Sequence, residues 1–423
     1  QWYFILSFVG LIFVGGMLLQ ISTALEGSPV SAINAYFLST SAVCVTGLSP
    51  ICISKMGIVS QLILLLLIQL GGLGLMTLTS SMILVVRREM NFDNKLLISG
   101  VMESYSGREL HPMLYVIPLY TFCIELCGAV LLTFCFWAGM RFPLGEAMYL
   151  GVFHAISAFC NAGFSTFDDL IRVGPMIKII IGALIVCGGL GFYVIYDLWQ
   201  VLRHKTFLRI YSKLVLVTSA ILIVAGALLI KGAERLDGAH ISWLDAFFQS
   251  ISARTAGFNT IDLTRLHPSS ILLLIALMMI GASPGSTGGG MKTTTFALAF
   301  IAVYKTFLGE RQITVFKRQI PMPNVLKAFS IMITYIIVSV IAVLFIAIYE
   351  DEPLYVMFFE AVSALGTVGF SLGLTAKAFF GTKVVLIVCM FLGRIGLFSF
   401  FIFLLAREKN SRLRYPEERI IMG

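Results

Sequence analysis

The sequence carries little charge. Charged residues make up 12% of its 423 residues, whereas hydrophobic residues make up 58%. Because a soluble domain has roughly 25% charged residues, this composition excludes an ordinary soluble enzyme or binding domain. The mean hydropathy is +0.95, which suits a lipid bilayer, and we expect an all-α integral membrane protein.

Signals for metal, redox, catalytic or nucleic-acid chemistry are also scarce. The eight cysteines form no Cys-x-x-Cys pair, and Cys123 and Cys127 lie one helical turn apart, as packing residues often do. The net charge of +8 comes without a basic patch interleaved with aromatic residues, so it does not indicate a nucleic-acid partner. The few charges at membrane depth fall in different parts of the chain. We therefore expect no catalytic residues and no cofactor in this chain.

A short motif occurs four times, at residues 44–49, 160–165, 254–259 and 366–371. Each copy has a few small or hydroxyl residues, a glycine, Leu or Phe, and then Ser or Asn. The four glycines are Gly47, Gly163, Gly257 and Gly369, and a second glycine-rich site follows each of them after 24 or 25 residues. Because two landmarks in step across four copies indicate an internal repeat, we expect four similar loops that converge on one axis.

Apolar runs surround every copy in the same order: a long run, a short run, the glycine loop and a second long run. The runs cover residues 2–21, 29–41 and 58–86; 113–137, 144–159 and 175–202; 214–230, 243–252 and 268–308; and 325–348, 354–365 and 384–406. A span needs about 20 apolar residues, and runs of roughly 10–14 are usually re-entrant or buried. We predict eight transmembrane helices and four re-entrant pore helices, with loops that cannot face lipid.

Basic residues predict the orientation. More than half of the 30 lysines and arginines follow the second long run of a quarter. They are Arg87, Arg88, Lys95, Arg108, Arg203, Lys205, Arg209, Lys213, Lys305, Arg311, Lys317, Arg318, Lys327, Arg407, Lys409, Arg412, Arg414 and Arg419. By the positive-inside rule these segments and both chain ends are cytoplasmic, and the glycine loops open outward. The outer side is richer in acid, and its pair Asp168 and Asp169 either attracts cations or forms a solvated turn.

The glycine loops have the composition of a cation filter made of main-chain oxygens. A dehydrated alkali cation needs oxygens of similar number and field strength to water, which rings of backbone carbonyls provide. Glycine permits positive φ and leaves no side chain in the path. No Asp or Glu lies in the loops, which argues against a carboxylate site for divalent cations. The alternative, that the glycines only permit close helix packing in lipid, explains one loop better than four in register.

The second long run of the third quarter is interrupted by the glycine-rich residues 281–290. Proline costs roughly 3 kcal/mol and glycine about 1 kcal/mol relative to alanine in a helix, so this stretch cannot be regular helix and should line a cavity. Gly285 and Gly290 have the spacing of a phosphate-binding loop. That motif, however, needs lysine directly after its last glycine, where this chain has Met291.

These motifs resemble the Trk/Ktr/HKT superfamily of potassium transporters over essentially the whole chain, and its Ktr-type membrane subunit most of all. The most specific stretches are residues 40–48, 254–260 and 281–294. The resemblance implies four helix–re-entrant pore loop–helix units with pseudo-fourfold symmetry around one pore. These units would cover residues 1–90, 91–205, 206–318 and 319–406, with a cytoplasmic tail at 407–423. The implied activity is potassium uptake across a bacterial-type plasma membrane.

The resemblance also implies residue roles. The potassium-binding filter would comprise Val45, Thr46, Gly47, Asn161, Ala162, Gly163, Thr255, Ala256, Gly257, Thr367, Val368 and Gly369. Gly47, at the first of the four filter-glycine positions, implies potassium rather than sodium. An intramembrane gate below the filter would comprise Gly281, Ser283, Pro284, Gly285, Gly288, Gly289, Gly290, Lys292 and Arg394. A homodimer is implied, with a cytosolic ring of nucleotide-binding subunits, so that ATP or ADP binds to the partner and not to this chain.

Four polar residues have alternative interpretations. A charge at the bilayer centre normally faces water or a partner. Arg394 either repels cations below the filter or is tied to carbonyls of residues 281–290 or to a carboxylate, and for Lys292 we favour the tie. Glu125 is either a proton or sodium coupling site or a helix–helix hydrogen bond, which we favour. His154 is expected at the start of a filter helix, as a rim or capping residue.

A carrier is the main rival to a channel-like pore. A proton- or sodium-coupled potassium symporter of the Trk type would also have broken helices near the midplane. Such carriers have paired or inverted halves, whereas this chain repeats one direct unit four times. A membrane-embedded enzyme ranks last, because it would need a catalytic cluster at membrane depth.

Overall fold

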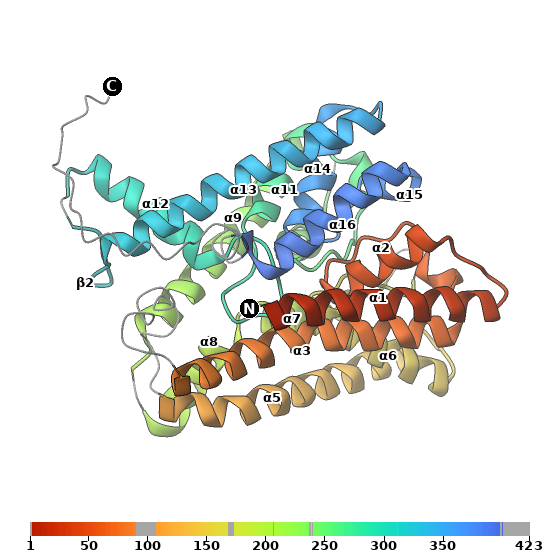
Figure 1. Ribbon diagram of the computed structural model, residues 1–423, viewed down its shortest axis with the longest axis horizontal. Helices are drawn as coiled ribbons and strands as arrows, with labels where there is room; N and C mark the ends of the chain where they lie inside the picture. Colours follow the sequence, from red (N-terminus) through yellow and green to blue (C-terminus); the bar gives the residue numbers. More distant parts are fainter. Residues whose placement is uncertain are drawn as a thin grey trace.

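The computed structural model describes residues 2–89, 107–167, 173–205, 207–236, 238, 240–310, 312–397 and 400. Long helices run side by side, with shorter helices packed among them (Figure 1). The strands in this described part are a two-residue antiparallel pair, β1 (Thr314–Val315) and β2 (Arg318–Gln319). The predicted all-α class is therefore confirmed.

The helices follow the predicted order in all four quarters. The first quarter has α1 (Trp2–Leu25), α2 (Ala32–Val43), η1 (Ile53–Lys55) and α3 (Ile58–Glu89). The second has α5 (Gly107–Phe134), the π-helical turn η3 (Cys135–Gly139), α6 (Leu144–Phe159), α7 (Pro175–Gly189) and α8 (Phe192–His204). The third has α9 (Ile210–Leu236), α10 (Trp243–Ser252), η5 (Leu263–Arg265), α11 (Pro268–Met279) and α12 (Thr293–Phe307). The fourth has α13 (Met322–Tyr349), α14 (Leu354–Leu365), α15 (Leu374–Lys377) and α16 (Phe380–Ile395).

The quarters are arranged in a closed ring. We call α2, α6, α10 and α14 the pore helices. The helix that follows each pore helix packs against the pore helix of the next quarter: α3 against α6, α7 against α10, α11 against α14, and α16 against α2. This repeated contact returns to its starting point after four steps, as pseudo-fourfold symmetry around one axis requires.

Four helices in the described residues are long and apolar enough to cross a membrane: Ile5–Leu25, Ile117–Gly139, Ile210–Leu236 and Met322–Tyr349. They come one from each quarter, and α7 with α8 would make a fifth bent span. The helices that follow the pore helices do not meet this criterion as single straight helices in the described residues; α7 and α8 are bent against each other, and α11 and α12 are separate helices. The count of eight spans therefore stays a prediction.

Two predicted spans differ from the structure. The run at 175–202 is not continuous, because α7 and α8 meet at a bend of 94°. Gly191 lies between them with φ +84°, a conformation that glycine adopts without steric cost. The run at 384–406 likewise breaks at Gly396, where φ is +91°. The tail at 407–423 and the pair Asp168 and Asp169 lie outside the described residues.

Candidate functional site

The four repeated loops meet at one place. A methyl group added to Gly47 would lie 3.2 Å from the Cα of Gly163. The corresponding distance is 3.1 Å from Gly163 to Gly257, from Gly257 to Gly369, and from Gly369 back to Gly47. The contacts therefore pass once around the axis and close, and the predicted convergence of the loops is observed.

The atom nearest to each of these added methyl groups is a main-chain oxygen of the next loop. These oxygens belong to Ala162, Ala256, Val368 and Thr46, in the order of the ring. Any side chain at the glycines would collide with them. The loops thus bring four carbonyl groups together at a point where only glycine fits.

The loop backbone has an unusual and repeated conformation. The four glycines have φ between +71° and +95°. The residue two places before each glycine is also left-handed: Val45 (φ +54°), Asn161 (+58°), Thr255 (+95°) and Thr367 (+51°). Positive φ is a genuine outlier for β-branched residues, and such strain persists only where the surroundings impose it, typically at functional sites. Left-handed residues at every second position turn successive carbonyls to the same side of the loop.

Hydrogen bonds from the loop N–H groups to carbonyls near the ends of the pore helices hold the loops in this conformation. Thr46 donates its N–H to Ser41, Ala162 to Ser157, and Val368 to Ser363, each with an N···O distance of 2.8 Å. In the third quarter Ala256 donates to Ser252 at 2.9 Å. On the far side of each glycine, the apolar residues Leu48, Phe164, Phe258 and Phe370 are at most 1% exposed. Each loop is therefore anchored at both ends.

Two polar residues behind the loops were not predicted in this role. His154 was expected at the start of its helix, but it lies in the second half of α6 and is fully buried. Its Nε2 is 3.1 Å from Ser165 Oγ, two residues after Gly163. In the fourth quarter Glu360 accepts a hydrogen bond of 2.5 Å from Ser371 Oγ. Both residues lie nine positions before one of the four loop glycines, and that shared spacing was the available signal.

Glu360 makes a fuller set of contacts than His154. It accepts further hydrogen bonds from the N–H of Leu372 at 3.1 Å and from Thr375 Oγ1 at 2.7 Å, and it is completely buried. The equivalent positions in the other two quarters are Leu38 and Phe248, both buried and apolar. Polar anchors therefore alternate with apolar anchors around the ring.

The interrupted segment lies directly beneath the loops. Residues 280–292 form no helix, and Ile280 pairs with Met291 in an isolated parallel bridge. A methyl group at Gly288 would collide with Thr255 Oγ1, and one at Gly289 with Thr367 Oγ1. Gly289 N–H also donates to Thr367 Oγ1 at 3.0 Å. The segment thus contacts the lower ends of the third and fourth loops.

The same segment is tied to the second quarter. Ser283 donates its N–H to the carbonyl of Gly189 at 3.1 Å, and Thr287 donates to that of Gly188 at 3.3 Å. Gly285 accepts from Phe192 N–H at 3.0 Å, at the first residue of α8. From the third quarter, Tyr211 of α9 donates its hydroxyl to Pro284 O at 2.8 Å. The residues at the break between α7 and α8 therefore contact this segment directly.

Both cations predicted near the segment are bonded to backbone carbonyls. Arg394 is 3% exposed; it donates to Thr287 O and, at 2.6 Å, to Gly71 O. Lys292 Nζ donates to Gly288 O at 2.7 Å. For both residues, the structure therefore has the alternative in which the side chain is hydrogen-bonded to backbone carbonyls. Arg394 links the segment to α3, so that the first quarter is also engaged.

Glu125 has the geometry of a helix–helix hydrogen bond. On α5, it accepts a hydrogen bond from Gln69 Nε2 of α3 at 3.0 Å. The Sγ of Cys160 lies 3.8 Å from its other oxygen. Among the described residues, no group of three or more His, Cys, Asp or Glu could hold a metal ion.

The second set of glycine landmarks has a packing role in three quarters. A side chain at Gly71, Gly188 or Gly393 would collide with the last carbonyls of a pore helix, those of Val43, Phe159 and Leu365 respectively. Glycine there lets the following helix approach the pore-helix end. In the third quarter Gly281 instead meets Gly289 O of the returning segment.

Comparisons with known proteins agree with this architecture. The family described as "TrkH: Cation transport protein" matches residues 8–222 and 207–413. The chain is 33% identical over 431 residues to "Ktr system potassium uptake protein B" of Vibrio alginolyticus. This alignment covers 99% of this chain and 94% of that protein. It is 31% identical over 436 residues to "Potassium/sodium uptake protein NtpJ" of Enterococcus hirae, with 99% and 96% covered. The crystal structure of the potassium transporter TrkH from Vibrio parahaemolyticus has a similar fold, with a TM-score of 0.73 at 21% identity over 95% of this chain and 84% of that chain.

Proposed function

The chain belongs to the TrkH family of cation transport proteins, and we propose that it takes up potassium ions across the plasma membrane through the ring of main-chain oxygens around its four glycines. The resemblance drawn from the motifs is thereby confirmed at the level of the family. The observation that carries the proposal is the closed contact from Gly47 through Gly163 and Gly257 to Gly369.

Selectivity would come from the loop carbonyls. A potassium ion that enters the ring exchanges its water for oxygens held at fixed positions by strained backbone. The filter would comprise the predicted residues, with the carbonyls of Thr46, Ala162, Ala256 and Val368 beside the glycines. The C-terminal ends of the pore helices add partial negative charge that favours a cation.

Residues 281–290 would act as the gate. The segment lies against Thr255 and Thr367 at the base of the loops, where an ion leaving the filter has to pass. Conduction therefore requires it to move. The contacts that would have to break for it to move include hydrogen bonds to single carbonyls, such as those from Arg394 and Lys292.

The assembly and orientation are proposed on the same basis. We expect a homodimer in a bacterial-type plasma membrane, with both chain ends in the cytoplasm and unit boundaries near residues 90, 205 and 318. A cytosolic ring of nucleotide-binding subunits would carry ATP or ADP and act on the gate. The relative from Vibrio alginolyticus is named as part of a "Ktr system", which supports a second component.

A proton- or sodium-coupled symporter is the second candidate. The relative from Enterococcus hirae is named as a potassium/sodium uptake protein. The hydrogen bond between Gln69 and Glu125 gives Glu125 a structural role, which weakens the case for a coupling carboxylate at that position.

Rubidium uptake into proteoliposomes would test the proposal. Purified protein should accumulate labelled rubidium, with inhibition by potassium and little inhibition by sodium. Uptake that needs a sodium or proton gradient in the same direction would support the coupled symporter. Vesicles that take up no rubidium in any gradient would contradict both.

A further inference from the structure

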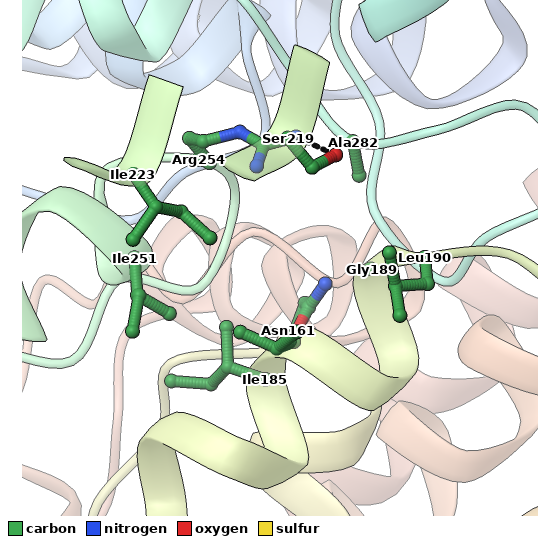
Figure 2. Close-up of a pocket in the computed structure, with 10 residues that line it drawn as sticks. Asn161, Ile185, Gly189, Leu190, Ser219, Ile223, Ile251, Arg254 and Ala282 are labelled. Carbon is green, nitrogen blue, oxygen red and sulfur yellow. Dashed lines mark hydrogen bonds between the residues drawn. The ribbon is translucent and has the colours of Figure 1, made fainter. Parts of the chain in front are cut away.

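A cavity lies at the seam between the second and third quarters, beside two filter loops. Figure 2 shows it with side chains from α7, α9, the third pore loop and the segment below the filter. Its walls include the apolar side chains of Ile185, Ile223 and Ile251, together with Ala282. The unfilled space is ≈ 320 Å³, including its open mouth.

A buried positive charge points into this cavity. Arg254 is 9% exposed, and its side chain lies along the cavity wall towards Ser219 (Figure 2). The contact to Ser219 Oγ, at 3.2 Å, is a hydrogen bond to a neutral group. The Nε of Arg254 is buried and has no hydrogen-bond partner. Within the described part of the chain, no aspartate or glutamate forms an ion pair with this guanidinium.

The other polar group in the cavity does not neutralise Arg254. With its amide oxygen and nitrogen exchanged relative to Figure 2, Asn161 donates to Ala158 O and Ile185 O, both at 3.1 Å. Its oxygen then lies 3.5 Å from Thr255 Oγ1, which can donate to it. Asn161 and Thr255 thus satisfy one another across the two loops, and the charge of Arg254 remains uncompensated.

We propose that this cavity binds a small monovalent anion, such as chloride, against the Arg254 guanidinium. An unpaired buried charge is strongly unfavourable, and charges at membrane depth normally pair or face water. The cavity is polar on one side and large enough for a water-sized guest. An anion beside Nε would complete the hydrogen bonding of Arg254, with Ser219 Oγ as a neighbouring hydroxyl.

The anion would act on the filter through charge. Arg254 immediately precedes Thr255, whose backbone belongs to the third loop. Without compensation, its positive charge raises the potential where a cation has to bind, and this effect is strong in a low-dielectric environment. A chloride ion at Arg254 would offset that charge.

Bromide gives a direct test that does not depend on transport. Crystals grown in bromide should show an anomalous peak in contact with the Arg254 guanidinium. Ile223→Phe, which fills the cavity from α9, should abolish the peak, as should Arg254→Gln. Ile221→Phe is the matched control, because Ile221 lies on the same helix and is 59% exposed. It should keep the peak.

Thermal unfolding of the purified protein provides a second measurement. Replacement of chloride by the bulky anion gluconate at constant potassium should lower the unfolding midpoint of the wild type and of Ile221→Phe, but not that of Ile223→Phe. Water alone at Arg254 in bromide crystals, or equal midpoints for the wild type in the two salts, would overturn the proposal. Neither result would bear on potassium selectivity.

Discussion

Gly369, in the last of the four loops, lies directly against the carbonyl oxygen of Thr46, in the first. This contact closes the ring within a single chain. Because the four loops are parts of one sequence, each can carry different residues, and the left-handed position is Val45 in one loop and Asn161 in the next. The four loops therefore share one backbone geometry but differ in their side chains.

Gly47→Ser should weaken selection for potassium over sodium. The position has φ +95°, and an added Cβ would lie 2.5 Å from Ala162 O, so serine has to displace a carbonyl of the neighbouring loop. Competition of sodium with rubidium uptake in proteoliposomes measures the effect. Gly10→Ser is the control, since an added Cβ there meets no atom within 4 Å. Unchanged selectivity in Gly47→Ser would contradict a carbonyl filter.

Arg394→Met should increase rubidium flux in the absence of the cytosolic partner. The substitution removes the hydrogen bonds to Thr287 O and Gly71 O that hold the proposed gate, residues 281–290, against α3. Lys383→Met on the same helix is the control, because Lys383 bonds to Asn34 at 2.9 Å, away from the gate. Flux through Arg394→Met equal to that of the wild type would argue against a tie that restrains the gate.

Glu360→Leu should lower both stability and selectivity. The change leaves the N–H of Leu372 and the hydroxyls of Ser371 and Thr375 without an acceptor. Thr375 is buried, and a buried unsatisfied group costs about 1–3 kcal/mol. Thermal unfolding and sodium competition would be measured together. Glu352→Gln, which affects only an exposed pair with Lys377, should shift stability by less than about 1 kcal/mol.

Gly191→Ala should disturb the gate from the second quarter. Alanine at φ +84° is strained, and its Cβ would lie 2.6 Å from Pro284 O. The expected result is a changed rubidium flux with retained potassium selectivity, because the four glycine loops are untouched. Gly174→Ala should have no effect on flux, since its added Cβ has no neighbour within 4 Å. A loss of selectivity in Gly191→Ala would show that α8 acts on the filter itself.

The ion pair between Lys178 and Asp245, at 2.7 Å, should make stability depend on pH. Burial of Asp245 opposes its ionisation, but hydrogen bonds from Lys178 and Ser242 outweigh this and lower the pKa of Asp245 below its usual value. A carboxyl group with a lowered pKa stabilises the folded state above its unfolded pKa, and this contribution is lost as pH falls through the folded pKa.

The unfolding midpoint of the wild type should therefore fall more than that of Asp245→Asn between about pH 5 and pH 3, because the Asp unfolded pKa is about 3.9. The variant should be less stable near neutral pH, since Lys178 is buried and loses its partner. Parallel curves for the two proteins would exclude this pair as a source of the pH dependence.

Local sequence patterns alone were sufficient to predict the order of helices and loops along the chain. Apolar runs predicted the helix order, and the repeated glycines predicted the loops, because hydrophobicity and the need for positive φ act on neighbouring residues. The same reasoning misplaced His154 at a helix start and missed the break at Gly191. Both errors arise because helix length and bending depend on what packs against the helix.

Residue patterns along the chain are enough to establish that four like loops exist and that each needs glycine. The three-dimensional contacts alone show which oxygen lies beside which glycine, that Arg394 bonds to carbonyls of residues 71 and 287, and that no ion pair with Arg254 is found in the described part of the chain. These relationships join residues that are far apart in the chain. They follow from the closure of the ring, which no local pattern encodes.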